Sequence, residues 1–225
     1  MKNHIDITFD LETVATTVNA AVMQVAAVVW LRDAVSDPFD IKHVCEPVFD
    51  GHVDLRSCVV EGYDFSPETL KWWSVQSEQA KKAVCEGLAE PIEDVFRGFV
   101  QWIKEVKEET NSDTLSLWCQ GMDFDAAILR NTCRRYDIPL DDVVDYRDFR
   151  DCRTIICEAG RTRLSAQGVT AVSLSQGGTS SQPSVYDVYE PLPSRYAQYG
   201  ALHDALYDAA LSSWRTWQAL HWLNR

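Results

Sequence analysis

Residues 4–12 constrain the fold most strongly, because apolar and polar side chains alternate there without interruption. The two rows are Ile5, Ile7, Phe9 and Leu11 against Asp6, Thr8, Asp10 and Glu12. A period of two indicates a β-strand with one apolar face. Residues 22–31 are apolar almost throughout, which is typical of a strand covered on both faces. The chain therefore begins with two strands of a largely buried sheet.

The remaining elements alternate between strand and helix along the chain. A third strand is expected at residues 42–49, where Pro47 favours an edge position. Ser66 and Pro67 are typical of the first residues of a helix, which we expect to run to about Ala83. The other expected elements are helices at 92–110, 124–136, 154–159 and 204–223 and extended segments at 114–119 and 143–149. This order predicts an α/β domain with a mixed, five-stranded sheet flanked by helices.

The length of 225 residues is that of one domain, so we expect residues 1–225 to form a single unit. Residues 161–198 interrupt its regular pattern, because they are rich in Gly, Ser and Pro. Such a composition indicates a long loop or an insertion, which in a compact domain is usually functional or mobile. The sequence does not show what this segment does.

The formal net charge of −13 argues against a protein that coats nucleic acid through a broad basic surface. It is compatible with an enzyme that holds a short stretch of nucleic acid through metal ions bound by carboxylates. Seven Cys without a C-x-x-C pair indicate a reducing environment. The N-terminus lacks an apolar signal segment, and the longest apolar run, residues 20–31, is too short to cross a bilayer. We therefore expect a cytoplasmic protein without a membrane partner.

Asp10 and Glu12 are the first candidate site residues. Two positions apart on a strand, they lie on one face and are close enough to share a cation, and hard dications such as Mg²⁺ prefer oxygen ligands. On its own the pair is better explained by a solvated strand face, because Asp6 and Thr8 belong to the same row.

Asp123 and Asp125 stand where the expected strand 114–119 gives way to a helix. An acid at such a junction commonly caps the helix by accepting hydrogen bonds from its first N–H groups. Asp123 is the better candidate for the N-cap, and Asp125 for the first helical turn. The sequence leaves open which of the two acids faces a site.

His203 and Asp208 open the last helix. On a continuous helix, residues five apart point about 140° away from each other. If Asp204 caps the helix, however, His203 lies just outside it and Asp208 lies one turn inside. His203 could then act as a base above a metal-binding Asp208, although a surface His beside an N-cap Asp is a common arrangement.

Together and in this order, the D-x-E, F-D and H-x-x-x-x-D motifs resemble those of the DEDDh family of 3′→5′ exonucleases, whose fold is ribonuclease H-like. The resemblance covers most of the chain outside residues 161–198. Two further stretches, 66–80 (SPETLKWWSVQSEQA) and 146–154 (YRDFRDCRT), resemble the branch that contains phage exonuclease A and bacterial 3′→5′ exoribonucleases. Asp123 departs from the pattern as an additional acid near the second motif.

The resemblance implies a two-metal hydrolysis that releases 5′-mononucleotides from the 3′ end of single-stranded nucleic acid. The implied ligands of two Mg²⁺ or Mn²⁺ ions are Asp10, which would bridge both ions, with Glu12, Asp125 and Asp208. His203 is the implied general base, so activity should rise with pH as its imidazole becomes neutral. The phage-like branch slightly favours DNA as the substrate, whereas the bacterial relatives suggest RNA.

The same resemblance implies that Trp72, Trp73, Gln76 and Ser77 bind the substrate. Successive residues of a helix point about 100° apart, so one Trp is expected in the core and the other against a base. An ordinary amphipathic helix is the alternative explanation of this segment.

Two other classes of function remain as alternatives. One is a catalytically inactive nucleic-acid-binding module of the same fold, and the other is an acidic interaction protein. Five motif residues in the expected order argue against both. The expected location is the cytoplasm of a bacterium or of a phage-infected host, and a homodimer stays open.

Overall fold

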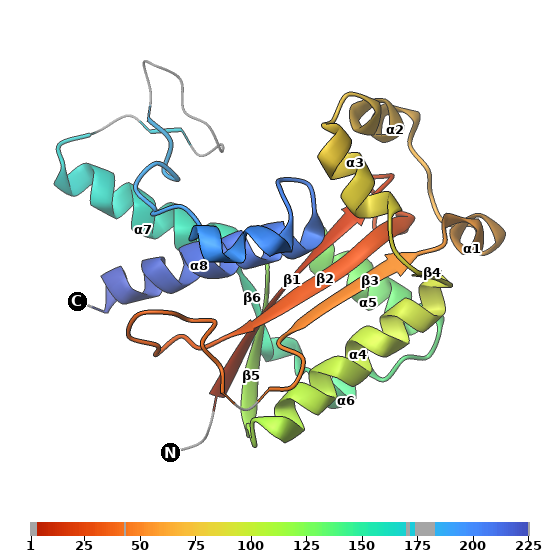
Figure 1. Cartoon of the computed structure of the whole chain (residues 1–225), viewed down its shortest axis with the longest axis horizontal. Coiled ribbons are helices and arrows are strands. Elements are labelled where there is room, and N and C mark those ends of the chain that lie inside the picture. Colours follow the sequence, from red (N-terminus) through yellow and green to blue (C-terminus); the bar gives the residue numbers. More distant parts are fainter. Residues whose placement is uncertain (1–3, 43, 170–171, 174–182, 225) are drawn as a thin grey trace.

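A mixed sheet of six strands forms the centre of the molecule in the described part of the chain (Figure 1). The computed structural model describes residues 4–42, 44–169, 172–173 and 183–224. The strands are β1 (His4–Thr13), β2 (Val22–Trp30), β3 (Val48–Val53), β4 (Ala89–Glu90), β5 (Thr114–Cys119) and β6 (Phe149–Asp151). The helices are α1 (Leu55–Val60), α2 (Pro67–Ser74), α3 (Glu78–Cys85), α4 (Ile92–Glu109), α5 (Asp125–Arg135), α6 (Leu140–Val143), α7 (Cys152–Ala166) and α8 (Ala205–Leu223), with 3₁₀ helices η1 (Tyr146–Asp148) and η2 (Ser194–Tyr199).

The strand order is β4-β3-β2-β1-β5-β6, with β1 in the middle of the sheet. β1 pairs antiparallel with β2 and parallel with β5, and β5 pairs parallel with β6. Because β1 and β5 are parallel neighbours, their carboxyl ends lie at the same edge of the sheet. Residues that end β1 and residues that follow β5 are therefore brought together.

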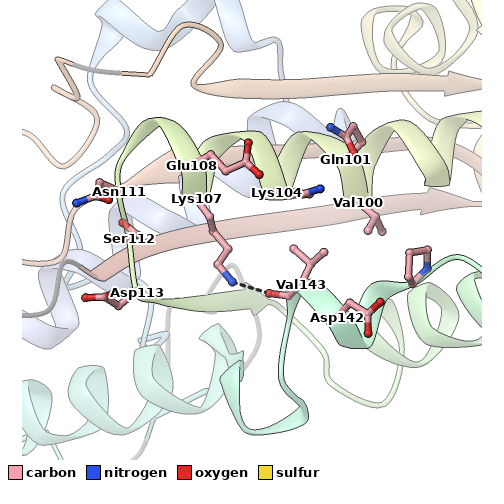
Figure 2. Close-up of a pocket in the computed structure, with 11 residues that line it drawn as sticks. Val100, Gln101, Lys104, Lys107, Glu108, Asn111, Ser112, Asp113, Asp142 and Val143 are labelled. Atoms are coloured by element: carbon pink, nitrogen blue, oxygen red, sulfur yellow. Dashed lines mark hydrogen bonds between the residues drawn. The ribbon is translucent and has the colours of Figure 1, made fainter.

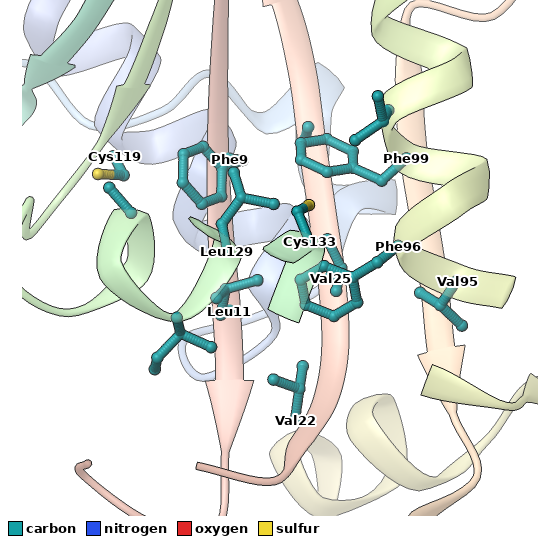
Figure 3. Close-up of a cluster of buried hydrophobic side chains, with 14 of the residues drawn as sticks. Phe9, Leu11, Val22, Val25, Val95, Phe96, Phe99, Cys119, Leu129 and Cys133 are labelled. Atoms are coloured by element: carbon teal, nitrogen blue, oxygen red, sulfur yellow. The ribbon is translucent and has the colours of Figure 1, made fainter. Parts of the chain in front are cut away.

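The apolar row of β1 packs against α4 and α5 on one face of the sheet. Figure 3 shows Phe9 and Leu11 of β1 with Val25 of β2, Phe96 and Phe99 of α4, and Leu129 of α5. The ring centroids of Phe9 and Phe99 are 5.9 Å apart. Cys119 and Cys133 add thiols to this core, and all seven cysteines are free. Burial of this row fixes the polar row of β1 on the opposite face, as the alternation predicted.

α7 and α8 cover that opposite face (Figure 1). Ala26 and Val28 of β2 pack against Ala205 and Ala209 of α8, where small side chains let the helix lie close to the sheet. None of the helices in the described ranges is long and apolar enough to cross a membrane. The helix layer leaves the polar row of β1 between sheet and helices.

The polar row is therefore not a solvated strand face, and that expectation is wrong. Asp6 and Thr8 are both 0% exposed. Asp6 accepts hydrogen bonds from Nε1 of Trp118 at 2.7 Å and from Nε of Arg32 at 2.8 Å. Thr8 accepts one from Nε1 of Trp30 at 2.9 Å. Hydrogen-bond donors from β2, β5 and the loop after β2 offset the cost of burying these polar groups. The alternation within one strand does not reveal such distant partners.

The third strand begins later than predicted, at Val48 instead of residue 42. Pro47 stands directly before it, because a residue without an N–H cannot donate to the ladder, and its carbonyl accepts from Val29 N at 2.9 Å. The two-residue strand β4 pairs with the end of β3 and was not predicted. The sheet therefore has six strands and not the expected five.

The helix expected from Ser66 to Ala83 is two helices, α2 and α3. Ser66 caps α2 as predicted, since its hydroxyl accepts from Thr69 N at 3.2 Å. Ser77 caps a second helix by accepting from Ala80 N at 3.0 Å. The chain leaves the helical path at residues 75–77 because this second cap competes with continuation of α2.

Two expectations near the C-terminal half also change. The extended segment at 143–149 is mostly α6 and η1, and only Phe149–Asp151 forms a strand. α7 runs from residue 152 to 166, so the first six residues of the expected loop 161–198 are helical. η2 gives regular structure to residues 194–199, and residues 170–171 and 174–182 of the same segment lie outside the described residues.

Candidate active site

Asp10 and Glu12 end the polar row of β1 on the face that α8 covers. Their cross-strand partners in β2 are Ala26 and Gln24, and the strand pairing shifts directly after Glu12. Glu12 is 9% exposed, and Asp10 is partly buried. The strand therefore places two carboxylates side by side at its carboxyl end.

Asp125 is the first residue of α5, and it reaches the same edge because β5 runs parallel to β1. The chain turns after β5 through a hydrogen bond from Phe124 N to Gly121 O at 3.0 Å. Asp125 is 4% exposed, whereas Asp123 is exposed to solvent. The N-cap is Phe124, which makes no side-chain cap, so the expectation that Asp123 caps the helix is wrong. The turn directs Asp125, and not Asp123, towards β1.

His203 and Asp208 have the arrangement expected at the start of α8. Asp204 is the N-cap and accepts from Leu206 N at 3.1 Å. His203 stands just before the helix with φ of 67°, a left-handed conformation that is uncommon outside glycine. Its backbone N–H donates to Oδ2 of Asp208 at 3.0 Å. The two side chains therefore meet although they are five residues apart.

All five motif residues line one cavity of about 240 Å³, which we call the carboxylate cavity. Its described lining consists of Asp10, Glu12, Asp125, His203 and Asp208 with Leu11, Gln120, Phe124, Arg153, Leu211 and Ser212. One potential ligand atom from each of Glu12, His203 and Asp208 lies within 4.8 Å of the other two. Segments separated by nearly two hundred residues thus converge at the edge shared by β1 and β5.

The carboxylates of this cavity repel one another in a buried setting. Burial is the largest cause that raises their pKa values, and their mutual charges add to it for Asp10 and Glu12. The pKa of Glu12 is raised to about 8 and that of Asp125 to about 7. Burial also raises the pKa of Asp208 to about 6, although the hydrogen bond from the backbone of His203 opposes the rise.

This donor set fits divalent cations. Carboxylate oxygens are the ligands that Mg²⁺ and Mn²⁺ prefer, and buried like charges require compensation by cations or protons. Arg153 is the one Lys or Arg in the described lining, and its Nη2 donates to Gln120 O at 2.7 Å. One guanidinium does not balance four carboxylates, so the cavity is suited to metal ions.

The metal-free protein is expected to lose stability as the pH rises from about 4, the ordinary pKa of a carboxyl group, to about 8. Because the pKa values of Asp208, Asp125 and Glu12 are raised to about 6, 7 and 8, the folded state binds protons more tightly than the unfolded chain. The stability from these protons is complete below the ordinary carboxyl pKa values, falls as the pH rises from there, and is lost once the pH exceeds the folded values. Thermal unfolding in EDTA should show the fall, and saturating Mg²⁺ should flatten it. A melting temperature in EDTA that stays constant across this interval would contradict the assignment.

A second hollow adjoins the carboxylate cavity and shares Leu11, Glu12 and Phe124 with it. We call it the tryptophan groove, with a volume of about 560 Å³ and a described lining completed by Thr13, Thr16, Ser66, Glu68, Thr69, Trp72 and Trp73. Trp73 is buried and its Nε1 donates to Thr13 O at 2.9 Å, whereas Trp72 is 44% exposed. The two tryptophans divide as predicted into one core residue and one surface residue.

Gln76 and Ser77 are not among the described residues that line either hollow. Gln76 donates from Nε2 to Trp72 O at 3.0 Å, and the hydroxyl of Ser77 caps α3. The structure therefore brings Trp72 and Trp73 to the site and gives Gln76 and Ser77 local partners. Binding of substrate by these four residues stays a prediction.

A different groove of about 510 Å³ lies between the C-terminal half of α4, the loop before β5, and α6 (Figure 2). Lys107 in this groove donates from Nζ to Val143 O at 2.9 Å. Its other charged lining mixes Lys104 with Glu108, Asp113 and Asp142. None of the residues predicted from the motifs lines it, so the carboxylate cavity is the candidate active site.

Sequence reasoning missed three polar residues of the carboxylate cavity: Gln120, Arg153 and Ser212. Arg153 falls within residues 146–154, which resemble the family, but its position in the sequence did not indicate a role. Ser212 donates from Oγ to Oε1 of Gln120 at 2.8 Å. No local pattern marks a Gln after a strand or a Ser within a helix, so only the fold could identify them.

The sequence was also compared with known proteins. Residues 5–220 match the family model described as the 3′-5′ exoribonuclease Rv2179c-like domain. No curated protein matches the chain.

The structure was also compared with solved structures, of which two with TM-scores above 0.5 show the likeness of the fold. E. coli exonuclease I in complex with a 5cy-dA13 oligonucleotide has 14% identity and a TM-score of 0.54, covering 99% of this chain and 43% of that chain. The complex of the same enzyme with a dT13 oligonucleotide has 15% identity and a TM-score of 0.52. The match covers 95% of this chain and 40% of that chain. The nuclease domain of 3′hExo, a DEDDh family member bound to rAMP, has 12% identity and a TM-score of 0.48. The match covers 98% of this chain and 92% of that chain.

The chain spans less than half the length of the exonuclease I chains. At these identities the structures show the fold alone, and they confirm the expected ribonuclease H-like α/β architecture. The family match confirms the resemblance to 3′→5′ exonucleases that the motifs suggested. Because this match extends over nearly the whole sequence, the chain belongs to the Rv2179c-like 3′-5′ exoribonuclease domain family.

Proposed function

We propose that this protein is a metal-dependent 3′→5′ exonuclease that removes 5′-mononucleotides from single-stranded 3′ ends. The observation that carries the proposal is the convergence of Asp10, Glu12, Asp125, His203 and Asp208 on one cavity. The family to which the chain belongs is described by the same polarity of degradation.

Asp10, Glu12, Asp125 and Asp208 would hold two divalent cations in the carboxylate cavity. Bound there, the cations would supply activation of the attacking water and stabilisation of the leaving 3′-oxygen. Asp10 belongs to this proposed ligand set because it lies on the middle strand, where burial and the charges of Asp125, Glu12 and Asp208 raise its pKa. The raised pKa values of these groups would return towards ordinary values when the charge is compensated.

His203 would accept the proton from the attacking water. Burial lowers the pKa of its imidazole, which favours the neutral form that can accept a proton. Its ring is held against Trp72 with centroids 4.8 Å apart at an interplanar angle of 84°. The side chain is therefore positioned at the junction between the carboxylate cavity and the tryptophan groove.

The tryptophan groove would take the 3′-terminal nucleotides of the substrate. The exposed indole of Trp72 offers a surface on which a base can stack, worth about 1–3 kcal/mol per base. Thr13, Ser66 and Thr69 line the same groove and would offer polar groups to the sugar of a bound nucleotide. Stacking on a base requires an unpaired end, which agrees with a single-stranded substrate.

We propose RNA as the preferred substrate and DNA as the slower one. The family match supports RNA through its description as an exoribonuclease. The exonuclease I complexes contain DNA oligonucleotides, and the sequence alone slightly favoured DNA, so both must be compared directly.

The test uses RNA and DNA oligonucleotides of one sequence, labelled at the 5′ end, with free or phosphate-blocked 3′ ends. We expect a ladder that shortens from the free 3′ end of RNA in Mg²⁺ or Mn²⁺, with no shortening in EDTA. Faster degradation of DNA would overturn the choice of sugar only. No degradation of either oligonucleotide with either metal would overturn the enzyme proposal and favour a binding module of the same fold.

A further inference from the structure

Gln24 is the one amide side chain in the otherwise apolar strand β2, and it is 1% exposed. A buried amide is unfavourable unless its hydrogen bonds are made. Its Oε1 accepts from Ala205 N at 3.1 Å, and its Nε2 donates to Oδ1 of Asp204 at 3.2 Å and to Oδ1 of Asp50 at 2.9 Å. One side chain of β2 therefore joins β3 to the start of α8, which is 180 residues away in sequence.

The position of Gln24 in the sheet explains why it reaches α8. Gln24, Ala26 and Val28 lie on one face of β2, and the latter two belong to one buried cluster with Ala205 and Ala209 of α8. The small side chains bring α8 close to the sheet, and the row ends with Gln24 beneath the first turn of the helix. Glu12 is the cross-strand partner of Gln24, so this tie lies beside the carboxylate cavity.

The backbone that this tie holds is unusual. His203 has φ of 67°, and its N–H donates to Oδ2 of Asp208 at 3.0 Å. A left-handed conformation in a residue with a side chain persists only where the surroundings enforce it. Gly200, with φ of 106°, approaches so closely that a Cβ there would overlap the carboxylate of Asp204. The Asp204 carboxylate is thus enclosed between Gly200 on one side and Gln24 on the other.

The polarity of Gln24 suits its neighbours. Asp204 and Asp50 are both acids, and the Nε2 group of Gln24 donates to each of them, which reduces their repulsion. His52 adds a further contact, with its Nε2 3.4 Å from Oδ1 of Asp50. A carboxylate in place of Gln24 would bring a third acid to the same buried group, and an apolar side chain would leave Ala205 N without this acceptor.

We propose that Gln24 is a positioning residue for the exonuclease reaction, whose amide holds Asp204 and the first turn of α8 so that His203 and Asp208 face Glu12. The proposal rests on the function proposed for the carboxylate cavity. Gln24 is not among the described residues that line that cavity, so it acts through Asp204 and the backbone of Ala205.

Gln24→Met tests the proposal, because it keeps the length of the side chain and removes all three hydrogen bonds. We expect kcat to fall roughly 10²-fold, the effect of displacing reacting groups by about 1 Å. The KM for the oligonucleotide should stay within about threefold of the parent value, since the tryptophan groove is unchanged. A variant that keeps the parental kcat and changes only in KM would overturn the positioning role.

A second set of variants exchanges the amide and carboxylate groups and tests whether kcat is rescued. Gln24→Glu should lower kcat at least as much as Gln24→Met, because it adds an acid beside Asp204. Combined with Asp204→Asn and Asp50→Asn, the carboxylate at position 24 receives an amide donor from each neighbour, and Asn remains a good helix N-cap. We expect this triple variant to recover roughly tenfold in kcat over Gln24→Glu. No recovery would show that the hydrogen bond between the side chains at positions 24 and 204 is not what positions the helix.

Hydrogen exchange measured by mass spectrometry tests the same proposal without turnover. In Gln24→Met the amides of residues 203–208 should exchange roughly tenfold faster, whereas residues 211–223 should exchange as in the parent. An inactive parent protein would refute the proposed function and leave this measurement intact.

Ser213→Ala is the matched control, because Ser213 is buried in α8 and its Oγ donates to Ala209 O at 2.8 Å. It should keep both the parental kcat and the parental exchange of residues 203–208. Unchanged exchange at residues 203–208 in Gln24→Met, or equal acceleration along all of α8, would overturn the role of Gln24.

Discussion

Asp208→Asn is expected to abolish nucleotide release while the protein remains folded. Asp208 lines the carboxylate cavity, and its Oδ2 accepts the backbone N–H of His203. Asn retains a carbonyl oxygen for this hydrogen bond but loses the negative charge that a hard dication requires. The loss of rate should exceed the roughly 10–100-fold effect of removing a partner outside the ligand shell. The measurement is single-turnover cleavage of a labelled RNA oligonucleotide in Mg²⁺ and in Mn²⁺.

The same substitution separates a ligand from a structural residue. Asp208 repels the other carboxylates of the cavity, so Asp208→Asn should make the metal-free protein at least as stable as the parent in EDTA. The rise in melting temperature on adding Mn²⁺ should shrink, because a ligand is missing. Asp123→Asn is the matched control, since Asp123 is exposed and outside the described lining. A near-parental rate for Asp208→Asn would remove Asp208 from the ligand set.

Features of the fold that depend on local patterns could be predicted from the sequence. The alternation in β1 gave the two faces of the strand, and the resulting burial of Phe9 and Leu11 fixed the direction of Asp10 and Glu12. A cap at Asp204 was one of two arrangements that the sequence allowed, and the structure has this one. In both cases the controlling interactions lie within a few residues of each other.

Features that depend on distant partners could not be predicted in this way. The burial of Asp6 requires Trp118, which is 112 residues away, and Arg32 from the loop after β2. The sequence left open whether Asp123 or Asp125 faces the site, because the turn after β5 decides which of them meets β1. Gln24 belonged to an apolar run, and only the docking of α8 gives its amide a function to perform.

The burial of Trp72 and Trp73 could be predicted only in part from the local sequence. Helical geometry predicted that Trp72 and Trp73 would diverge, but not which of them would be buried. Trp73 is the core residue because Thr13 O, at the carboxyl end of β1, accepts its indole N–H. Its exposed neighbour is consequently left beside His203.

His203→Asn is expected to slow turnover by roughly 10²–10⁴-fold, the usual contribution of a general base. Asn is chosen because His203 has φ of 67°, a conformation that Asn tolerates better than Ala. The backbone N–H to Asp208 is retained in the variant, so the start of α8 should keep its structure. The parent rate should rise with pH until the imidazole is neutral, and burial lowers the pKa of His203, which places this rise below the ordinary range. The variant should lose this pH-dependent rise.

Metal affinity distinguishes the two roles that the position of His203 allows. A ring nitrogen of His203 lies within 4.8 Å of oxygens of Glu12 and Asp208, which is close enough for a ligand as well as for a base. If His203 is only a base, His203→Asn should leave the affinity for Mn²⁺ in calorimetric titration unchanged, because the four carboxylates remain. If His203 is a ligand, the substitution should weaken the affinity for Mn²⁺ together with the rate, since one bond to the ion is lost. Unchanged affinity with a slow rate would identify His203 as the base, whereas parallel losses would transfer it to the ligand set and leave proton acceptance to another group.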